Sequence, residues 1–134
     1  MRSRAVLSAT LDPEREHAEL LALLAAFRDA VAAGRRPAEL VPIFEQALDF
    51  ARLHFRHEEQ VMAQAGYPGL AAHRAEHDRL LAEVTERLLR LRAGNAAAPV
   101  AACRYLENGL QQHFESADKA CYRYLHRSTI RAGH

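Results

Sequence analysis

Residues 54–77 read HFRHEEQVMAQAGYPGLAAHRAEH, and this stretch decides the fold of the 134-residue chain. Gly66 ends one apolar, helix-forming segment, and Pro68 with Gly69 makes a turn before the next. A link this short between two long helices predicts that they lie side by side and antiparallel. Histidine and glutamate recur at four-residue spacing on both sides of the turn.

Similar helix-start and helix-end signals divide the rest of the chain. Asp12 and Pro13 suit a helix start, Gly34 and Pro37 mark a second break, and GNAAAP (94–99) marks a third. Apolar residues between the breaks recur at helical spacing, and strand-like alternation is not evident. The sequence predicts one domain over residues 1–134, an all-α, antiparallel up-down-up-down four-helix bundle with helices at about 13–33, 38–65, 69–93 and 99–126.

Composition excludes several classes of protein. The formal net charge is +1, so no strong field favours nucleic acid or a membrane surface. The chain has no run of 18 apolar residues and no evident signal peptide, so we expect a cytoplasmic protein. Its two cysteines, Cys103 and Cys121, are expected to be small core residues rather than a disulfide framework.

The chain contains eight histidines, and five of them fall on helix faces that should point inward. In an up-down bundle these five, Glu58 and Asp118 also share one layer, about 6 to 20 Å from the same end at about 1.5 Å per residue. The candidate ligands are His17, His54, Glu58, His73, His77, His113 and Asp118. The remaining histidines, His57, His126 and His134, are expected to be solvated.

Such a layer would be unstable without a cation, because buried carboxylates need a compensating charge. Imidazole and carboxylate ligands suit iron, manganese or zinc, and seven of them exceed the usual coordination number of one ion. The layer therefore predicts two metal ions that share the carboxylates. Five residues of ideal helix turn Asp118 about 140° away from His113, so we predict a helix irregularity between the two, for instance a π-bulge. The alternative is that Asp118 reaches in from the flank of the helix.

These segments resemble the hemerythrin family, in particular its bacterial members, the bacteriohemerythrins. The resemblance rests on HFRHEEQVM (54–62), GYP (66–68), HRAEH (73–77), HFESAD (113–118) and His17, and it covers about residues 12–124. Members of this family, myohemerythrin among them, fold as up-down-up-down bundles, so the resemblance implies the same fold as the helix pattern does.

The resemblance implies a role for each ligand. His73, His77 and His113 would bind one iron ion, and His17 and His54 would bind the other. Glu58 and Asp118 would bridge the two, together with an oxo or hydroxo group. Dioxygen would bind at the open position of the second ion.

One position departs from the family pattern. Where the family often has tryptophan, four residues before the last histidine ligand, this chain has Gly109. We expect Leu110 to face the oxygen pocket and Gly109 to widen access to it. The alternative is that neighbouring Phe or Leu side chains fill the gap.

The ligand set favours reversible oxygen binding over oxidation chemistry. Five neutral histidines outnumber two carboxylates, whereas ferritin-like sites use Glu-x-x-His pairs, which occur here only at Glu14–His17. We expect an oxygen carrier or store without enzymatic activity. An oxygen or redox sensor, and di-iron turnover of peroxide or nitric oxide, remain alternatives, and no protein partner is predicted.

Overall fold

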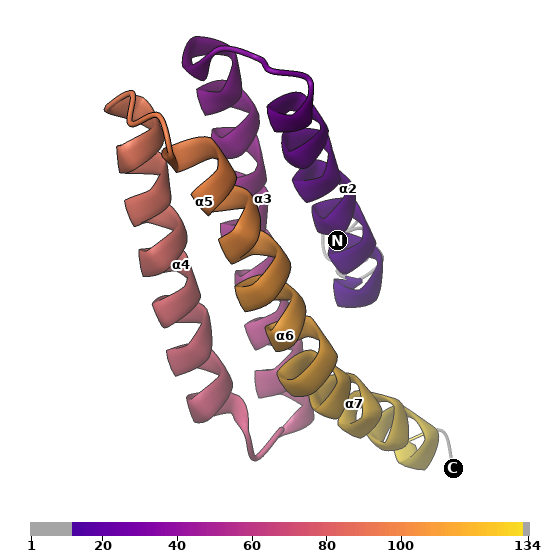
Figure 1. Cartoon of the computed structure of the whole chain (residues 1–134). Coiled ribbons are helices and arrows are strands. Elements are labelled where there is room, and N and C mark those ends of the chain that lie inside the picture. Colours follow the sequence, from indigo (N-terminus) through magenta and orange to yellow (C-terminus); the bar gives the residue numbers. More distant parts are fainter. Residues whose placement is uncertain (1–11, 133–134) are drawn as a thin grey trace, which may run out of the picture.

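The computed structural model describes residues 12–132, and these residues form a four-helix bundle without strands. Helix α2 spans Pro13–Ala32, α3 spans Pro37–Ala65 and α4 spans Leu70–Arg92. The fourth helix is continuous but varied: its parts are α5 (Ala98–Tyr105), η1 (Leu106–Leu110), α6 (Gln111–His113), η2 (Phe114–Asp118) and α7 (Lys119–Ala132). The chain runs alternately up and down, as predicted (Figure 1).

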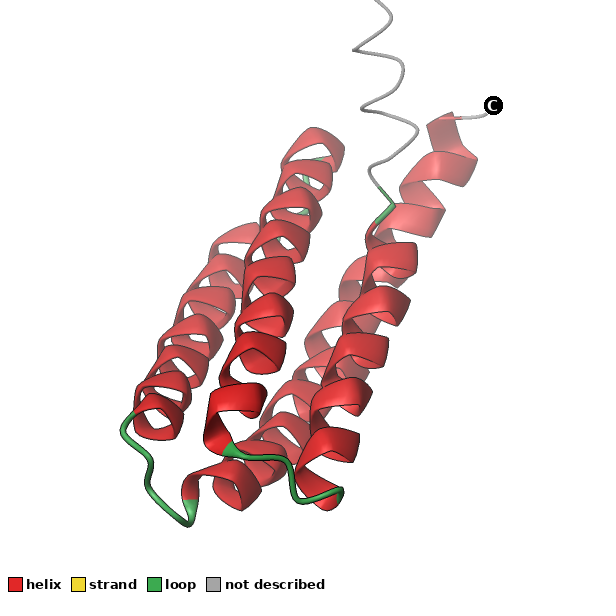
Figure 2. Cartoon of the chain, turned by 90° about the horizontal axis from the view of Figure 1, so that it is seen from above, coloured by secondary structure: helices red, strands yellow, loops and turns green. Residues whose placement is uncertain are grey.

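Short loops join the helices, as Figure 2 shows. The Asp12 side chain caps α2 by accepting a 3.2 Å hydrogen bond from the backbone N–H of Arg15. Gly66 ends α3 at φ 68°, in the left-handed region that glycine adopts most easily. The next residue, Tyr67, donates its backbone N–H to the carbonyl of Met62 at 2.9 Å, so the chain reverses within a few residues.

An apolar core fills the half of the bundle near the loops that join α2 to α3 and α4 to α5. Phe27 and Phe44 pack there with ring centroids 4.9 Å apart, and both are buried. Leu40, Leu88 and Leu91 complete the same layer. The opposite half holds the buried histidines and carboxylates, with apolar side chains such as Phe55 and Phe114 packed against them.

The fourth helix widens twice. Residues Leu106–Leu110 and Phe114–Asp118 are π-helical, with each turn holding one residue more than an α-helical turn. The second widening lies between His113 and Asp118, which confirms the predicted irregularity. The helix then continues to Ala132, beyond the predicted end near residue 126.

None of the helices in the described part of the chain is both long and apolar enough to cross a membrane.

Candidate metal centre

The seven predicted ligand residues come from all four helices. His17 lies on α2, His54 and Glu58 lie on α3, His73 and His77 lie on α4, and His113 and Asp118 lie on the fourth helix. Six of them are buried, each at most 4% exposed, and His17 is half-buried. One helix alone could not place these groups together, so the bundle itself builds the site.

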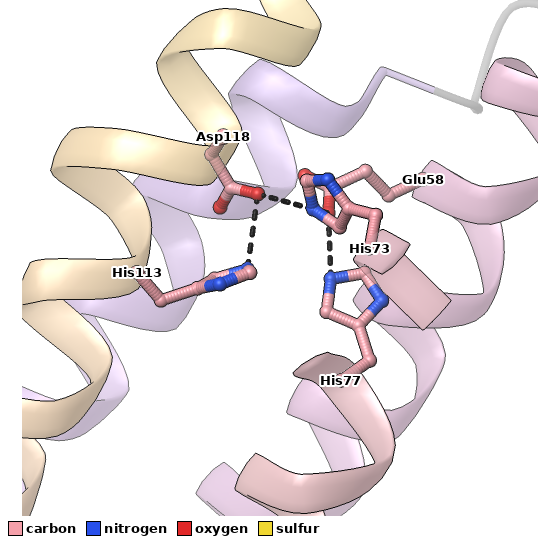
Figure 3. A group of neighbouring side chains, drawn as sticks. All are labelled: Glu58, His73, His77, His113 and Asp118. Carbon is pink, nitrogen blue, oxygen red and sulfur yellow. Dashed lines mark hydrogen bonds and ion pairs between the residues drawn. The ribbon is translucent and has the colours of Figure 1, made fainter. Parts of the chain in front are cut away.

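Five of the seven residues form a tight cluster, shown in Figure 3. Glu58, His73, His77, His113 and Asp118 each offer one ligand atom, and these atoms all lie within 4.8 Å of one another. Nε2 of His73 lies 2.8 Å from Oδ1 of Asp118 and 3.2 Å from Oε1 of Glu58. The same two oxygens lie 3.1 Å from Nε2 of His113 and 3.0 Å from Nε2 of His77, respectively.

These separations suit ligands that share one metal ion, although the 2.8 Å contact between His73 and Asp118 is also that of a hydrogen bond. Two ligand atoms about 2.1 Å from an ion and at right angles to each other lie about 3.0 Å apart. Among the described residues, His77 Nε2, His113 Nε2 and Asp118 Oδ2 are buried without a hydrogen-bond partner. Buried polar atoms rarely lack a partner, so this arrangement fits a cation at the centre of the cluster.

His17 and His54 form a second, smaller group beside the first. Their rings stack with centroids 6.2 Å apart, and Nε2 of each is buried without a hydrogen-bond partner in residues 12–132. His54 Nε2 lies 3.6 Å from Oε2 of Glu58, whose other oxygen faces the first cluster. Glu58 therefore stands between three histidines on one side and two on the other.

Comparison with known proteins agrees with this geometry. The family model described as "Hemerythrin HHE cation binding domain" matches residues 13–125, which is most of the chain. The chain belongs to the hemerythrin family. Family membership and the buried cluster together indicate a metal site and support a function of the di-iron, oxygen-binding type.

Two bacteriohemerythrins illustrate the similarity to other hemerythrins. The protein of Methylococcus capsulatus is 29% identical over 104 residues, which cover 78% of this chain and 79% of that protein. The protein of Stenotrophomonas maltophilia is 31% identical over 81 residues, or 60% of this chain and 52% of that protein. The chain thus spans about half the length of the second relative. The comparison with solved structures found no match for this chain.

Three glutamates that the sequence did not reveal as part of the site contact the outward-facing Nδ1 atoms of ligand histidines. Each is next to a ligand in the sequence, and each contacts a histidine on the following helix. The contacts are Glu16 Oε1 to His54 Nδ1 at 3.3 Å, Glu59 Oε2 to His77 Nδ1 at 2.7 Å, and Glu76 Oε1 to His113 Nδ1 at 3.5 Å. At His54 and His77 the contact is a hydrogen bond, and an N–H donated outward from Nδ1 leaves the Nε2 lone pair free to face inward.

Tyr122 is a further residue that the sequence analysis missed. Its hydroxyl donates a 2.7 Å hydrogen bond to Oε2 of Glu58. Burial, followed by the nearby Glu58 charge, raises the pKa of the Tyr122 hydroxyl, so this group stays protonated and remains a donor. The only signal in the sequence was its place one turn after Asp118.

The electrostatics of the cluster favour a positive charge at its centre. Burial lowers the pKa of His73, but hydrogen bonds with Asp118 and Glu58 outweigh it and raise that pKa to about 9. Burial opposes the charge on Glu58, yet the close contacts of its carboxylate with His73 and His77 hold its pKa well below the usual range. Two carboxylates that together draw a proton onto an imidazole would also attract a metal cation.

Apolar rings surround the ligands. The Phe55 ring stacks on His77 with centroids 3.9 Å apart and planes 2° apart, and the Phe114 ring lies 4.1 Å from that of His17. Leu110, one turn before His113, is buried and lines a small apolar cavity of about 10 Å³, which Phe55 also lines. That is room for about one water-sized molecule.

Gly109 lies against another side chain. A Cβ atom at this position would come within 2.9 Å of Cε1 of Tyr105, whose ring occupies the adjacent space. The Arg87 guanidinium lies 4.0 Å from the centre of the same ring. Gly109 does not line the cavity beside Leu110. Its access role stays a prediction, and the side chain that fills the gap is tyrosine rather than the phenylalanine or leucine considered above.

The three remaining histidines differ from one another. His57 was expected to be solvated, but this prediction is wrong: its side chain is only 22% exposed and bonds to Glu16 at 2.6 Å. His126 is exposed and contacts Glu14 at 2.9 Å, and His134 lies outside the described residues. Cys121 is buried as expected, whereas Cys103 is half-buried.

Proposed function

We propose that this chain binds dioxygen reversibly at a non-haem di-iron centre and serves as an oxygen carrier or store. The observation that supports it most directly is the position of Glu58 and Asp118 in a ligand set dominated by histidine. Neutral imidazoles leave the metal pair with little negative charge from the protein, which suits reversible binding better than oxidation chemistry.

The residues would divide into two sets. His73, His77 and His113 would hold one iron ion, and His17 and His54 would hold the other. Glu58 and Asp118 would bridge the pair, since Asp118 has one oxygen toward the three-histidine cluster and a second buried oxygen without a partner among the described residues. When bound, the two ferrous ions would supply two electrons and an open coordination position for dioxygen.

Side chains around the ligands would orient them and exclude water. The outer glutamates orient the imidazoles, and Tyr122 fixes Glu58. Phe55 and Phe114, which pack on His77 and His17, and Leu110, one turn before His113, would exclude water from the centre, because their buried apolar surface offers water no hydrogen bond. Exclusion of water would slow the irreversible oxidation of the centre to the ferric state, which favours a carrier.

Anaerobic reconstitution tests this proposal. The metal-free protein is loaded with Fe(II) under argon and then cycled between air and argon while the visible spectrum and the iron content are recorded. We expect two iron ions per chain and a visible band that appears in air and fades under argon. Asp118→Ala should lose both, whereas His126→Gln, at an exposed histidine, should behave as the wild type.

Two results would contradict the carrier role. Irreversible conversion during the first exposure to air would favour a sensor or an enzyme. Failure to bind two metal ions would reject the di-iron centre itself.

A further inference from the structure

His57 has a partner that links it to the candidate metal centre. Its Nδ1 lies 2.6 Å from Oε2 of Glu16, and the other oxygen of that carboxylate lies 3.3 Å from Nδ1 of His54. His54 and His57 are nearly one turn apart on α3, and Glu16 reaches them from α2. One carboxylate is therefore held by two imidazoles from the neighbouring helix.

These contacts are largely shielded from water. The exposed fraction of the side chain is 0% for His54, 12% for Glu16 and 22% for His57. The chain of contacts thus begins in the buried site and ends near the surface. A hydrogen bond that is mostly shielded from water orients its partners better than an exposed one.

The other two outer glutamates are held in a comparable way. Glu59 contacts His77 through one oxygen, while its second oxygen accepts a 3.3 Å hydrogen bond from Nε of Arg74. Glu76 accepts a 2.9 Å hydrogen bond from Arg79. Each of these carboxylates is thus anchored by an arginine, and at Glu16 the anchor is His57.

The anchor determines what Glu16 can do for His54. An imidazole can bind a metal through Nε2 only while its proton is on Nδ1, and a carboxylate at Nδ1 selects that form. A glutamate side chain alone has several rotatable bonds and must lose their freedom to stay in place. His57 holds the second oxygen and so keeps the first one aimed at His54.

We propose that His57 is a positioning residue that acts through Glu16 to orient His54, and so sets metal affinity at the position formed by His17 and His54. The three-histidine position, which has its own glutamates, does not depend on it. The inference rests on the proposed di-iron centre, but it concerns ion binding rather than oxygen binding.

Metal titration separates the two positions. Co(II) is added to the metal-free protein in competition with a chelator, and visible spectra record each binding step. In His57→Leu we expect the stronger step to be unchanged and the weaker step to lose about tenfold in affinity, as is usual when an outer partner of a ligand is removed. His57→Gln, whose amide can still donate to Glu16, should recover most of the loss.

A double-mutant cycle distinguishes positioning from general support of the fold. His57→Leu should weaken the second step in the wild-type background but add nothing in a Glu16→Ala background, because the intermediary is already gone. His126→Leu, at a histidine that also contacts an α2 glutamate, is the matched control and should leave both steps unchanged.

The outcomes are distinct. If both affinities fall equally, or if neither changes in His57→Leu, the inference is overturned and the proposed function stands. If the wild type binds no more than one ion, the di-iron centre is rejected and the inference falls with it. Circular dichroism and thermal unfolding confirm that each variant is folded before titration.

Discussion

The Asp118 carboxylate lies 3.1 Å from the His113 imidazole, measured from Oδ1 to Nε2, although five residues separate the two positions on one helix. The π-helical turn Phe114–Asp118 makes this approach possible, because an α-helix of the same length would turn Asp118 about 140° away. The widened turn is thus what brings the last ligand into the cluster.

Removing one exposed residue from that turn tests its role. A π-turn is one residue longer than an α-turn, so deletion of Ser116 should restore a regular helix with the two ligands four residues apart, about 40° from alignment. We expect the variant to stay helical and to bind two metal ions. The matched deletion of Ala82, in regular α4, should rotate one half of that helix by about 100° and abolish binding. Equal damage from both deletions would contradict this prediction.

Tyr122→Phe tests the hydrogen bond to Glu58. The hydroxyl donates to a buried carboxylate, and a hydrogen bond to a charged group contributes about 1.5–3 kcal/mol. We expect the free energy of unfolding of the metal-loaded protein to fall by about that amount, measured by denaturant titration. Tyr124→Phe, which removes a hydroxyl bonded to the Gly66 carbonyl at 3.3 Å, is the control and should cost less.

Gly109 and Tyr105 should be coupled energetically. Alanine in a helix is favoured over glycine by about 1 kcal/mol, but here its Cβ would meet the Tyr105 ring at 2.9 Å. Gly109→Ala should therefore stabilise the protein by about 1 kcal/mol in a Tyr105→Ala background and by clearly less in the wild type. Gly109→Trp must displace the same ring, and we expect it to slow oxygen exchange. Additive free energies of unfolding would refute the coupling.

Leu110 should control the oxygen pocket. Leu110→Ala enlarges the small cavity shared with Phe55, so we expect dioxygen to leave several-fold faster in stopped-flow measurements. Loss of a buried leucine also costs about 2–5 kcal/mol of stability. Leu53→Ala, at a leucine that is 40% exposed, provides the control. Unchanged oxygen dissociation in a folded Leu110→Ala variant would remove Leu110 from the pocket.

The two cysteines should differ in their reaction with a thiol reagent. Burial raises the pKa of Cys121 to about 12, and its side chain is inaccessible, so the reactive thiolate is scarce at any pH below that value. Burial also raises the pKa of Cys103, which is nevertheless half-buried. Raising the pH from about 7 to about 9 should speed labelling of Cys103, while Cys121 should react only after unfolding. Labelling of both at one rate in the native protein would be inconsistent with this arrangement.

Much of this architecture could be read from the sequence because glycine, proline and apolar spacing act locally. Gly66 and Pro68 end one helix whatever lies around them, and inward-facing positions follow from helical periodicity. The widened turn before Asp118 could be predicted because an ideal helix turns a ligand at five-residue spacing away from the first ligand. The spacing between His113 and Asp118, rather than either residue alone, therefore predicted the irregular helix.

The outer contacts could not be predicted in the same way. Glu16, Glu59 and Glu76 lie at the edges of their helices, where a glutamate is usually solvated, and each finds its partner on another helix. His57 falls off the apolar stripe for the same reason. Tyr105 covers Gly109 along one helix, which depends on a rotamer that periodicity does not specify. Contacts at helix edges require the packing of neighbouring helices to be known.

The part of the apolar core that lies away from the ligands has a consequence for the life of the protein in a cell. Phe27, Phe44 and their neighbours pack the helices together away from the ligands, so we expect the metal-free protein to stay helical even though its ligand layer is destabilised. Small metal-dependent domains such as zinc fingers unfold when their ion is removed. Here we expect newly made chains to mature in two separate stages, and iron scarcity to yield an inactive pool that later supply can restore without new synthesis.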